Sequence, residues 1–151
     1  MLKKYATLAL LGLAFCCGAF ADDDSVRIPT RFGDLKTNDA FELTYKDKVI
    51  KPKTLVFSPS RVQSTFKLES SDVILLSADT GAACPGRYVF LTVSADGAKV
   101  TPEFGTCYDD QVSPQLVGQS IAFSMKKLGG KGSVRYIYER GVVFENGTPV
   151  K

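Results

Sequence analysis

The stretch that decides the fold is RYVFLTV at residues 87–93, followed by the turn ADG at 95–97 and by AKVT at 98–101. The β-branched and aromatic residues of the first run are typical of a strand, and Asp-Gly is typical of a tight hairpin turn. Residues 89–91 are apolar on both faces, so we expect this strand to lie centrally. The stretch therefore predicts a β-hairpin whose first strand is buried.

A cysteine flanks this hairpin on each side, Cys84 before it and Cys107 after it. If the turn closes between Ser94 and Ala98, the strand register brings the two cysteines to within a residue or two of each other. We therefore predict a Cys84–Cys107 disulfide. A redox-active pair is the alternative interpretation, but the CxxC spacing typical of such pairs is absent.

Alternation of apolar and polar residues recurs on both sides of the hairpin and is typical of half-buried strands. It covers residues 41–46, 62–69, 121–126 and 134–139. Residues 73–76 are apolar on both faces and predict a second central strand. Turn-forming residues fall between these runs, at 46–48, 70–72, 129–132 and 146–147, and only 112–116 could form a short helical turn. The pattern predicts an all-β fold, an antiparallel sandwich or barrel of about eight strands with one disulfide.

The N-terminus reads as an export signal. Lys3 and Lys4 precede an apolar stretch, and Ala19-Phe20-Ala21 matches an A-x-A cleavage site. The apolar stretch is about 10 residues long, too short to span a bilayer, so we expect no membrane span after cleavage. We expect residues 1–21 to be a cleaved signal peptide and residues 22–151 to form a single β domain.

The signal also bears on the compartment. Cys16 and Cys17 end the apolar run and raise the alternative of a lipid anchor, but Phe15 stands where lipoprotein signals carry a small residue. A short lysine-led signal is typical of bacterial export. We therefore expect an unanchored periplasmic or secreted protein, in which Cys84 and Cys107 meet an oxidising environment.

Composition excludes several functions. The chain has 19 basic and 16 acidic side chains and no histidine. Without histidine, Ser-His-Asp triads and the usual His-containing zinc sites are excluded. The charge is nearly balanced once Lys3 and Lys4 leave with the signal, so nucleic-acid binding is not expected. We expect no cofactor and no metal.

The strongest match to a catalytic motif is Ser124-Met125-Lys126-Lys127, which fits the S-x-x-K motif of penicillin-interacting serine enzymes. That motif needs Ser and Lys one helical turn apart, whereas a strand would place Ser124 and Lys127 on opposite faces. We therefore expect a protein that is not an enzyme. A hydrolase that pairs Asp109 with a distant acid such as Glu103 stays open as an alternative.

The predicted disulfide would gather four residues at one rim, namely Asp79, Tyr108, Asp109 and Asp110. Loops pinned by a disulfide lose little entropy on binding, so these residues are our candidate binding surface for a basic protein partner. Two other interpretations stay open. The residues could be solvated loop positions, or they could form a calcium site, although no Asp-x-Asp-x-Asp pattern arranges them.

In size, signal, all-β pattern and single disulfide, the chain resembles small periplasmic β-proteins that bind and block other proteins, such as bacterial lysozyme inhibitors and exported immunity proteins. No family motif is matched, so the resemblance assigns no functional residue. It implies a non-enzymatic periplasmic inhibitor or immunity factor that blocks a secreted hydrolase or toxin. A β-barrel carrier of a small molecule or glycan is the alternative, and the oligomeric state is left open.

Overall fold

The computed structural model describes residues 26–52, 61–78, 83–108 and 111–151. These residues form three antiparallel sheets and no α-helix, which confirms the all-β prediction. The predicted signal peptide at 1–21 lies outside the described residues. The described part has thirteen strands rather than about eight, because several are two- or three-residue pieces between tight turns.

Each sheet is a meander of neighbouring hairpins. The N-terminal sheet contains β1 (Arg27–Ile28), β2 (Leu35–Thr37), β3 (Leu43–Tyr45) and β4 (Lys48–Val49). The middle sheet contains β5 (Val62–Lys67), β6 (Ser71–Ser77), β7 (Tyr88–Ser94) and β8 (Gly97–Val100). The C-terminal sheet contains β9 (Gln115–Val117), β10 (Ser120–Lys126), β11 (Ser133–Glu139), β12 (Val142–Glu145) and β13 (Thr148–Pro149).

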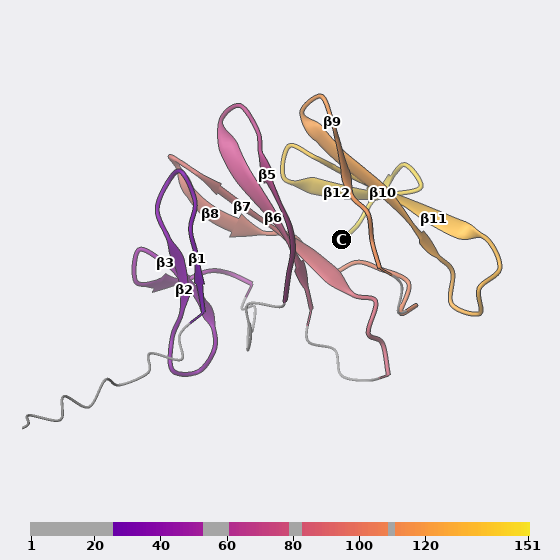
Figure 1. Ribbon diagram of the computed structural model, residues 1–151, viewed down its shortest axis with the longest axis horizontal. Helices are drawn as coiled ribbons and strands as arrows, with labels where there is room; N and C mark the ends of the chain where they lie inside the picture. The colour runs from indigo at the N-terminus through magenta and orange to yellow at the C-terminus, as the bar shows by residue number, and fades with distance from the viewer. Residues whose placement is uncertain (1–25, 53–60, 79–82, 109–110) are drawn as a thin grey trace, which may run out of the picture.

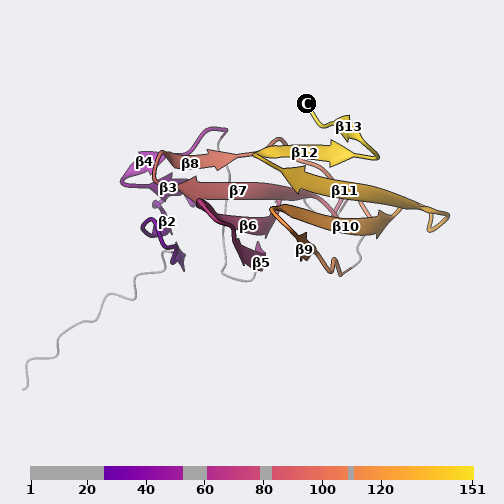
Figure 2. The ribbon, with the colours of Figure 1, turned by 90° about the horizontal axis from the view of Figure 1, so that it is seen from above.

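The three sheets stack as layers, with the middle sheet between the other two (Figures 1 and 2). Along β6, Val73 and Leu75 belong to the core shared with the C-terminal sheet, while Ile74 and Leu76 belong to the core shared with the N-terminal sheet. All four side chains are fully buried. The doubly apolar runs therefore occupy central strands, as predicted.

The core between the middle and C-terminal sheets is largely aromatic. Phe90 stacks on Phe104 with ring centroids 5.5 Å apart and packs against Tyr138 at 4.7 Å. Phe123 and Tyr136 fill the space on the other side of Phe104 at 6.0 and 5.2 Å. Aromatic rings bury large apolar areas, so this cluster is the main hydrophobic contact between the two layers.

The β7–β8 hairpin is as predicted, with a tighter turn. Ser94 pairs with Gly97 rather than with Ala98, which leaves Ala95 and Asp96 as a two-residue turn. Gly97 has a φ of 131°, a backbone conformation that residues other than glycine rarely adopt. The pairing of the two strands is continued beyond β8 by an isolated bridge between Tyr88 and Phe104.

Phe41 was expected to point inward from a strand, and this prediction is wrong. It lies in a turn at a φ of 56° and is 38% exposed. The cause is Asn38, whose side-chain oxygen accepts hydrogen bonds from the backbone N–H groups of Ala40 and Glu42. This Asx-type turn overrides the alternating pattern, so the strand begins only at Leu43.

The helical turn considered for 112–116 is also absent. Residues Gln115–Val117 form β9 instead and pair with the start of β10. Leu116 and Val117 are 46% and 63% exposed, so their apolarity reflects an edge strand.

Asp72 was expected in a turn but lies within β6, only 2% exposed. Its carboxylate accepts hydrogen bonds from the backbone N–H and Nε of Arg31, both at 2.7 Å. The same guanidinium donates to the carbonyl oxygens of Leu68 and Ser71 at 2.6 and 2.9 Å. Arg31 thereby fastens the N-terminal segment to the β5–β6 turn.

Candidate functional site

The predicted disulfide is present and joins Cys84 to Cys107 with a Cα–Cα distance of 4.2 Å. It lies just beyond the bridge between Tyr88 and Phe104, whose backbone N–H groups donate to each other's carbonyl oxygens at 2.8 and 2.9 Å. The disulfide therefore closes one end of the middle sheet. We call this region, residues 83–87 and 103–108 with the β10–β11 turn, the pinned rim.

Two glycines allow the chains of the pinned rim to cross in direct contact. A Cβ added at Gly86 would lie 2.1 Å from the backbone oxygen of Tyr108. A Cβ added at Gly105 would lie 2.1 Å from the backbone oxygen of Gly86. Neither position has room for any side chain, so the crossing depends on glycine at both.

Arg87 adds a second clasp across the same crossing. Its Nη1 donates to the carbonyl oxygen of Gly105 at 3.0 Å and its Nη2 donates to that of Glu103 at 3.1 Å. A guanidinium presents several donors in a fixed plane, so one side chain holds two carbonyl groups of the neighbouring segment. The pinned rim is thus fixed by a covalent bond, a backbone contact and a charged clasp.

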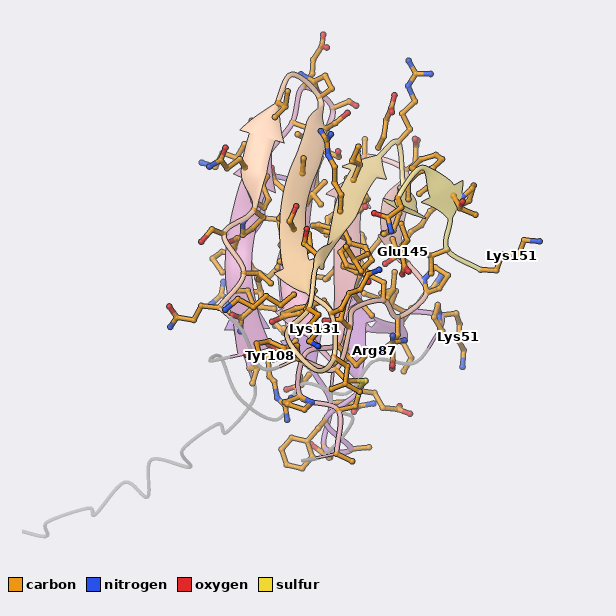
Figure 3. All side chains as sticks on the ribbon, turned by 90° about the vertical axis from the view of Figure 1, so that its right-hand side faces the viewer. Lys51, Arg87, Tyr108, Lys131, Glu145 and Lys151 are labelled. Carbon is orange, nitrogen blue, oxygen red and sulfur yellow. A yellow bond between two sulfur atoms is a disulfide. The ribbon has the colours of Figure 1, made fainter. Side chains whose placement is uncertain are left out.

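The far side of the pinned rim rests on the end of β10. Thr106 donates from its hydroxyl to the carbonyl oxygen of Lys126 at 2.6 Å. The Lys126 ammonium lies 5.5 Å from the centre of the Tyr108 ring, within cation–π range. Tyr108 is held half-buried at the surface in this way, beside the lysine-rich β10–β11 turn that contains Lys127 and Lys131 (Figure 3).

A partly buried hydrogen bond lies beneath the rim. The Tyr136 hydroxyl donates to the Glu145 carboxylate at 3.0 Å, and Tyr136 is 1% exposed. Burial raises the pKa of Tyr136, and the Glu145 carboxylate raises it further, while Arg87 acts in the opposite direction. The Tyr136 hydroxyl therefore stays protonated and donates this hydrogen bond, so its role here is structural.

The structure locates only part of the predicted binding surface. Tyr108 lies at the pinned rim with the disulfide, as expected, whereas Asp79, Asp109 and Asp110 lie outside the described residues. Among the described residues, no group of three Asp, Glu, Cys or His could hold a metal ion.

Sequence reasoning missed Arg87 and Lys126, which carry the main charged contacts of the rim. Arg87 could have been found, because it directly follows the Cys84-Pro85-Gly86 run. Lys126 could not, since its ring partner is 18 residues away and the contact depends on how two sheets stack.

The S-x-x-K match begins in a strand, as expected. Ser124 lies on the exposed face of β10, opposite Arg135, and Lys127 follows the strand in the turn. The strand conformation denies the pair the helical spacing that the motif requires.

No family model, curated protein or solved structure matches this chain. In the described part of the chain, no helix is long and apolar enough to cross a membrane.

Proposed function

We propose that this chain is an exported, non-enzymatic protein that binds a protein partner through the pinned rim and blocks it. The observation that carries the proposal is the threefold fixing of that rim, by the Cys84–Cys107 bond, the Gly86–Tyr108 backbone contact and the Arg87 clasp. These devices go beyond what closing a hairpin needs.

Rigidity favours binding because association costs the entropy of every loop and side chain that becomes ordered. A loop that is already fixed avoids most of this cost. The rim also offers a suitable anchor, since Tyr is enriched where protein surfaces meet. Tyr108 supplies the aromatic ring, and Lys126, Lys127 and Lys131 supply positive charge beside it.

The predicted acidic residues would complete this surface. Asp109 and Asp110 directly follow Tyr108, and Asp79 precedes Cys84 by five positions in the sequence. Acidic groups beside the lysines would give the rim both signs of charge, which favours a specific partner over general attraction to one sign.

A carrier with an internal cavity is less well supported. The aromatic rings between the middle and C-terminal sheets have centroid separations from 4.7 to 6.5 Å, so they fill the space that an enclosed ligand would need. A carrier of that kind needs a lined hollow within the sheets.

Export is part of the proposal. It rests on the signal-like residues 1–21 and on the disulfide, a bond that persists in oxidising compartments. Mass spectrometry of protein isolated from the periplasmic fraction should give a chain that begins at Asp22 and lacks free thiols.

The binding test compares immobilised wild-type protein with Tyr108→Ala and Asp109→Lys variants, using the exported proteins of the producing cell. Lys48→Ala is the matched control, because Lys48 is an exposed residue of the N-terminal sheet. We expect one protein to be retained by the wild type and the control, and to be lost from both rim variants.

The retained protein is then purified and its own activity is measured with and without the chain. Inhibition by the wild type and not by Tyr108→Ala would support blocking. Retention that is equal for all four proteins, or a partner whose activity the wild type leaves unchanged, would overturn the proposal.

A further inference from the structure

A groove of about 530 Å³ lies at the end of the molecule opposite the pinned rim, between the middle and C-terminal sheets. Its walls come from the β5–β6, β7–β8, β9–β10 and β11–β12 turns and the strand ends beside them. Figure 1 shows the β5–β6 and β9–β10 turns together at the top, away from the β10–β11 turn below. We call this feature the end groove.

The end groove is present because the residues of β7 that face the C-terminal sheet change from aromatic to polar along the strand. Tyr88 and Phe90 belong to the aromatic core, but the next two alternate positions are Thr92 and Ser94, which line the groove. On β8 the groove-lining residue opposite Thr92 is Lys99. Polar residues thus occupy positions that would otherwise continue the core.

The floor of the groove is a hydrogen-bonded pair of hydroxyls. Tyr138 from β11 and Thr92 from β7 lie 2.5 Å apart, oxygen to oxygen. Tyr138 is 1% exposed, and burial raises the pKa of its hydroxyl, so the group remains neutral. The two sheets are therefore held at a fixed separation under the groove.

Four charged side chains line the walls, and none forms an ion pair within the described part of the chain. Lys99 and Arg140 are the basic pair, and Glu69 and Asp96 are the acidic pair. Because none of the four is held in an ion pair there, each is available to a ligand.

The charged groups come from three turns and from β8, with Asp96 in the β7–β8 turn next to the strand that carries Lys99. Lys99 lies on β8 and Arg140 in the β11–β12 turn, and Figure 2 shows β8 and β12 on the same side of the stack. Glu69 lies on the other side, in the β5–β6 turn, where its backbone N–H donates to the Gln119 side chain at 3.1 Å. Hydroxyls of Thr92 and Ser94 lie between the two sides.

We propose that the end groove binds a small polar ligand with a single carboxylate, which Lys99 and Arg140 receive. Arg and Lys together favour a carboxylate strongly, because their hydrogen bonds to it are charge-assisted. The hydroxyls in between and the Gln119 amide suit the hydroxyl or amide groups of the rest of such a ligand.

The acidic pair sets the expected charge of the ligand. A ligand with several negative charges would face Glu69 or Asp96 as well as the basic pair, so one negative charge is favoured. The volume of about 530 Å³ falls within the range of ordinary small-molecule sites and suits a ligand of sugar or dipeptide size. An acidic monosaccharide and a dipeptide share this chemistry.

Two probe pairs, each a molecule with a carboxylate and its counterpart without one, test the proposal and distinguish the two sources. The first is glucuronate against glucose, and the second is glycylglycine against its C-terminal amide. Binding to protein purified from the producing cells is followed by chemical-shift changes of the backbone amides at 92–99 and 138–141. We expect the carboxylate-bearing member of at least one pair to bind at least about tenfold more tightly than its counterpart, because the carboxylate contact is charge-assisted.

Variants then assign the carboxylate contact. Lys99→Met keeps the aliphatic stem, and Arg140→Asn suits the φ of 48° at that position. Each should weaken binding of the carboxylate-bearing probe by about tenfold or more. Lys131→Met, at the opposite end, is the control and should bind like the wild type.

Both altered residues are exposed, so either variant alone can decide the matter. The proposal is overturned if no carboxylate-bearing probe shifts the groove amides at about 10 mM, a concentration at which even millimolar binding is seen. It is equally overturned if the probes with and without a carboxylate bind alike, or if Lys99→Met and Arg140→Asn bind like the control. Because the pinned rim is untouched, partner capture by the Tyr108 surface is unaffected by these results.

Discussion

The two ends of the same pair of sheets are built in opposite ways. At the pinned rim the chains are drawn together until backbone atoms touch, by Cys84–Cys107 and by glycine at 86 and 105. At the end groove the same two sheets leave an open space above the Thr92–Tyr138 pair. Residues with hydroxyl and charged groups line this space in place of aromatic rings. The aromatic core between them fixes the spacing that both ends share.

This difference indicates which end contributes most to the stability of the fold and which end offers polar groups for binding. The pinned rim derives its order from covalent and steric constraint, so changes there should cost the most stability. The end groove lacks such devices, and its polar residues gain little from folding.

The largest effect is expected for Gly86→Ala at the rim. The added Cβ would meet the backbone oxygen of Tyr108 at 2.1 Å, and neither backbone can yield without opening the crossing. We expect the free energy of unfolding in urea to fall by more than about 3 kcal/mol.

The control is Gly97→Ala in the β7–β8 turn, where an added Cβ meets nothing within 4 Å and only the φ of 131° is strained. It should cost about 1 kcal/mol. Equal losses in the two variants would show that the rim crossing is no tighter than an ordinary turn.

Removal of the disulfide ranks second. The Cys84→Ala, Cys107→Ala double variant frees a loop with a sequence separation of 23 residues. The chain-entropy model gives a loss of about 3 kcal/mol in unfolding free energy. Wild-type protein in a thiol reductant should reach the same urea midpoint as the variant, and a midpoint unchanged in both would mean that the bond does not constrain the unfolded chain.

Much of the rim's framework could be predicted from the sequence, because the information is local. The hairpin follows from β-branched runs around Asp96-Gly97, and its register brings Cys84 near Cys107. A one-residue difference in the turn did not matter, since a disulfide tolerates that much displacement.

The end groove could not be predicted, because it depends on which strands of different sheets face each other. Thr92 and Tyr138 are 46 positions apart and meet only when the sheets stack. The sequence does show that alternation turns polar after Phe90, but it does not tell a solvent-facing end from a groove wall. Asp72 escaped prediction for the same reason, since its partner Arg31 lies in another sheet's segment.

The third prediction concerns that Arg31–Asp72 pair, which lies near the groove end. Asp72→Ala leaves the Arg31 guanidinium without its buried partner, and we expect a loss of about 2 kcal/mol, because the Arg31 side chain is 40% exposed and keeps some solvent. Asp34→Ala breaks the more exposed Arg27–Asp34 pair and should cost at most about 0.5 kcal/mol. Urea unfolding of both variants measures the difference, and a larger loss for Asp34→Ala would contradict the ranking.

The fourth prediction uses the Tyr136 hydroxyl beneath the rim. Burial and Glu145 raise its pKa in the folded state, so the folded protein holds this proton where the unfolded chain releases it, above a pKa of about 10. The stabilisation is therefore complete below about pH 10 and is lost as the pH rises, by up to about 1.4 kcal/mol per pH unit. Urea unfolding at several alkaline pH values should show a steeper decline for the wild type than for Tyr136→Phe, and parallel declines would contradict the assignment.

The smallest effect is expected at the groove floor. Thr92→Val keeps the shape of the side chain but leaves the Tyr138 hydroxyl without its partner at 2.5 Å. We expect a loss of about 1 kcal/mol, because the buried Tyr138 hydroxyl loses one hydrogen bond while its bond to the Gly141 backbone remains. Thr65→Val on the exposed side of β5 controls for the substitution itself and should be nearly neutral. A loss for Thr92→Val that matched the disulfide variant would mean that the groove floor carries as much stability as the rim, and the two ends would then differ in shape without differing in how they are held.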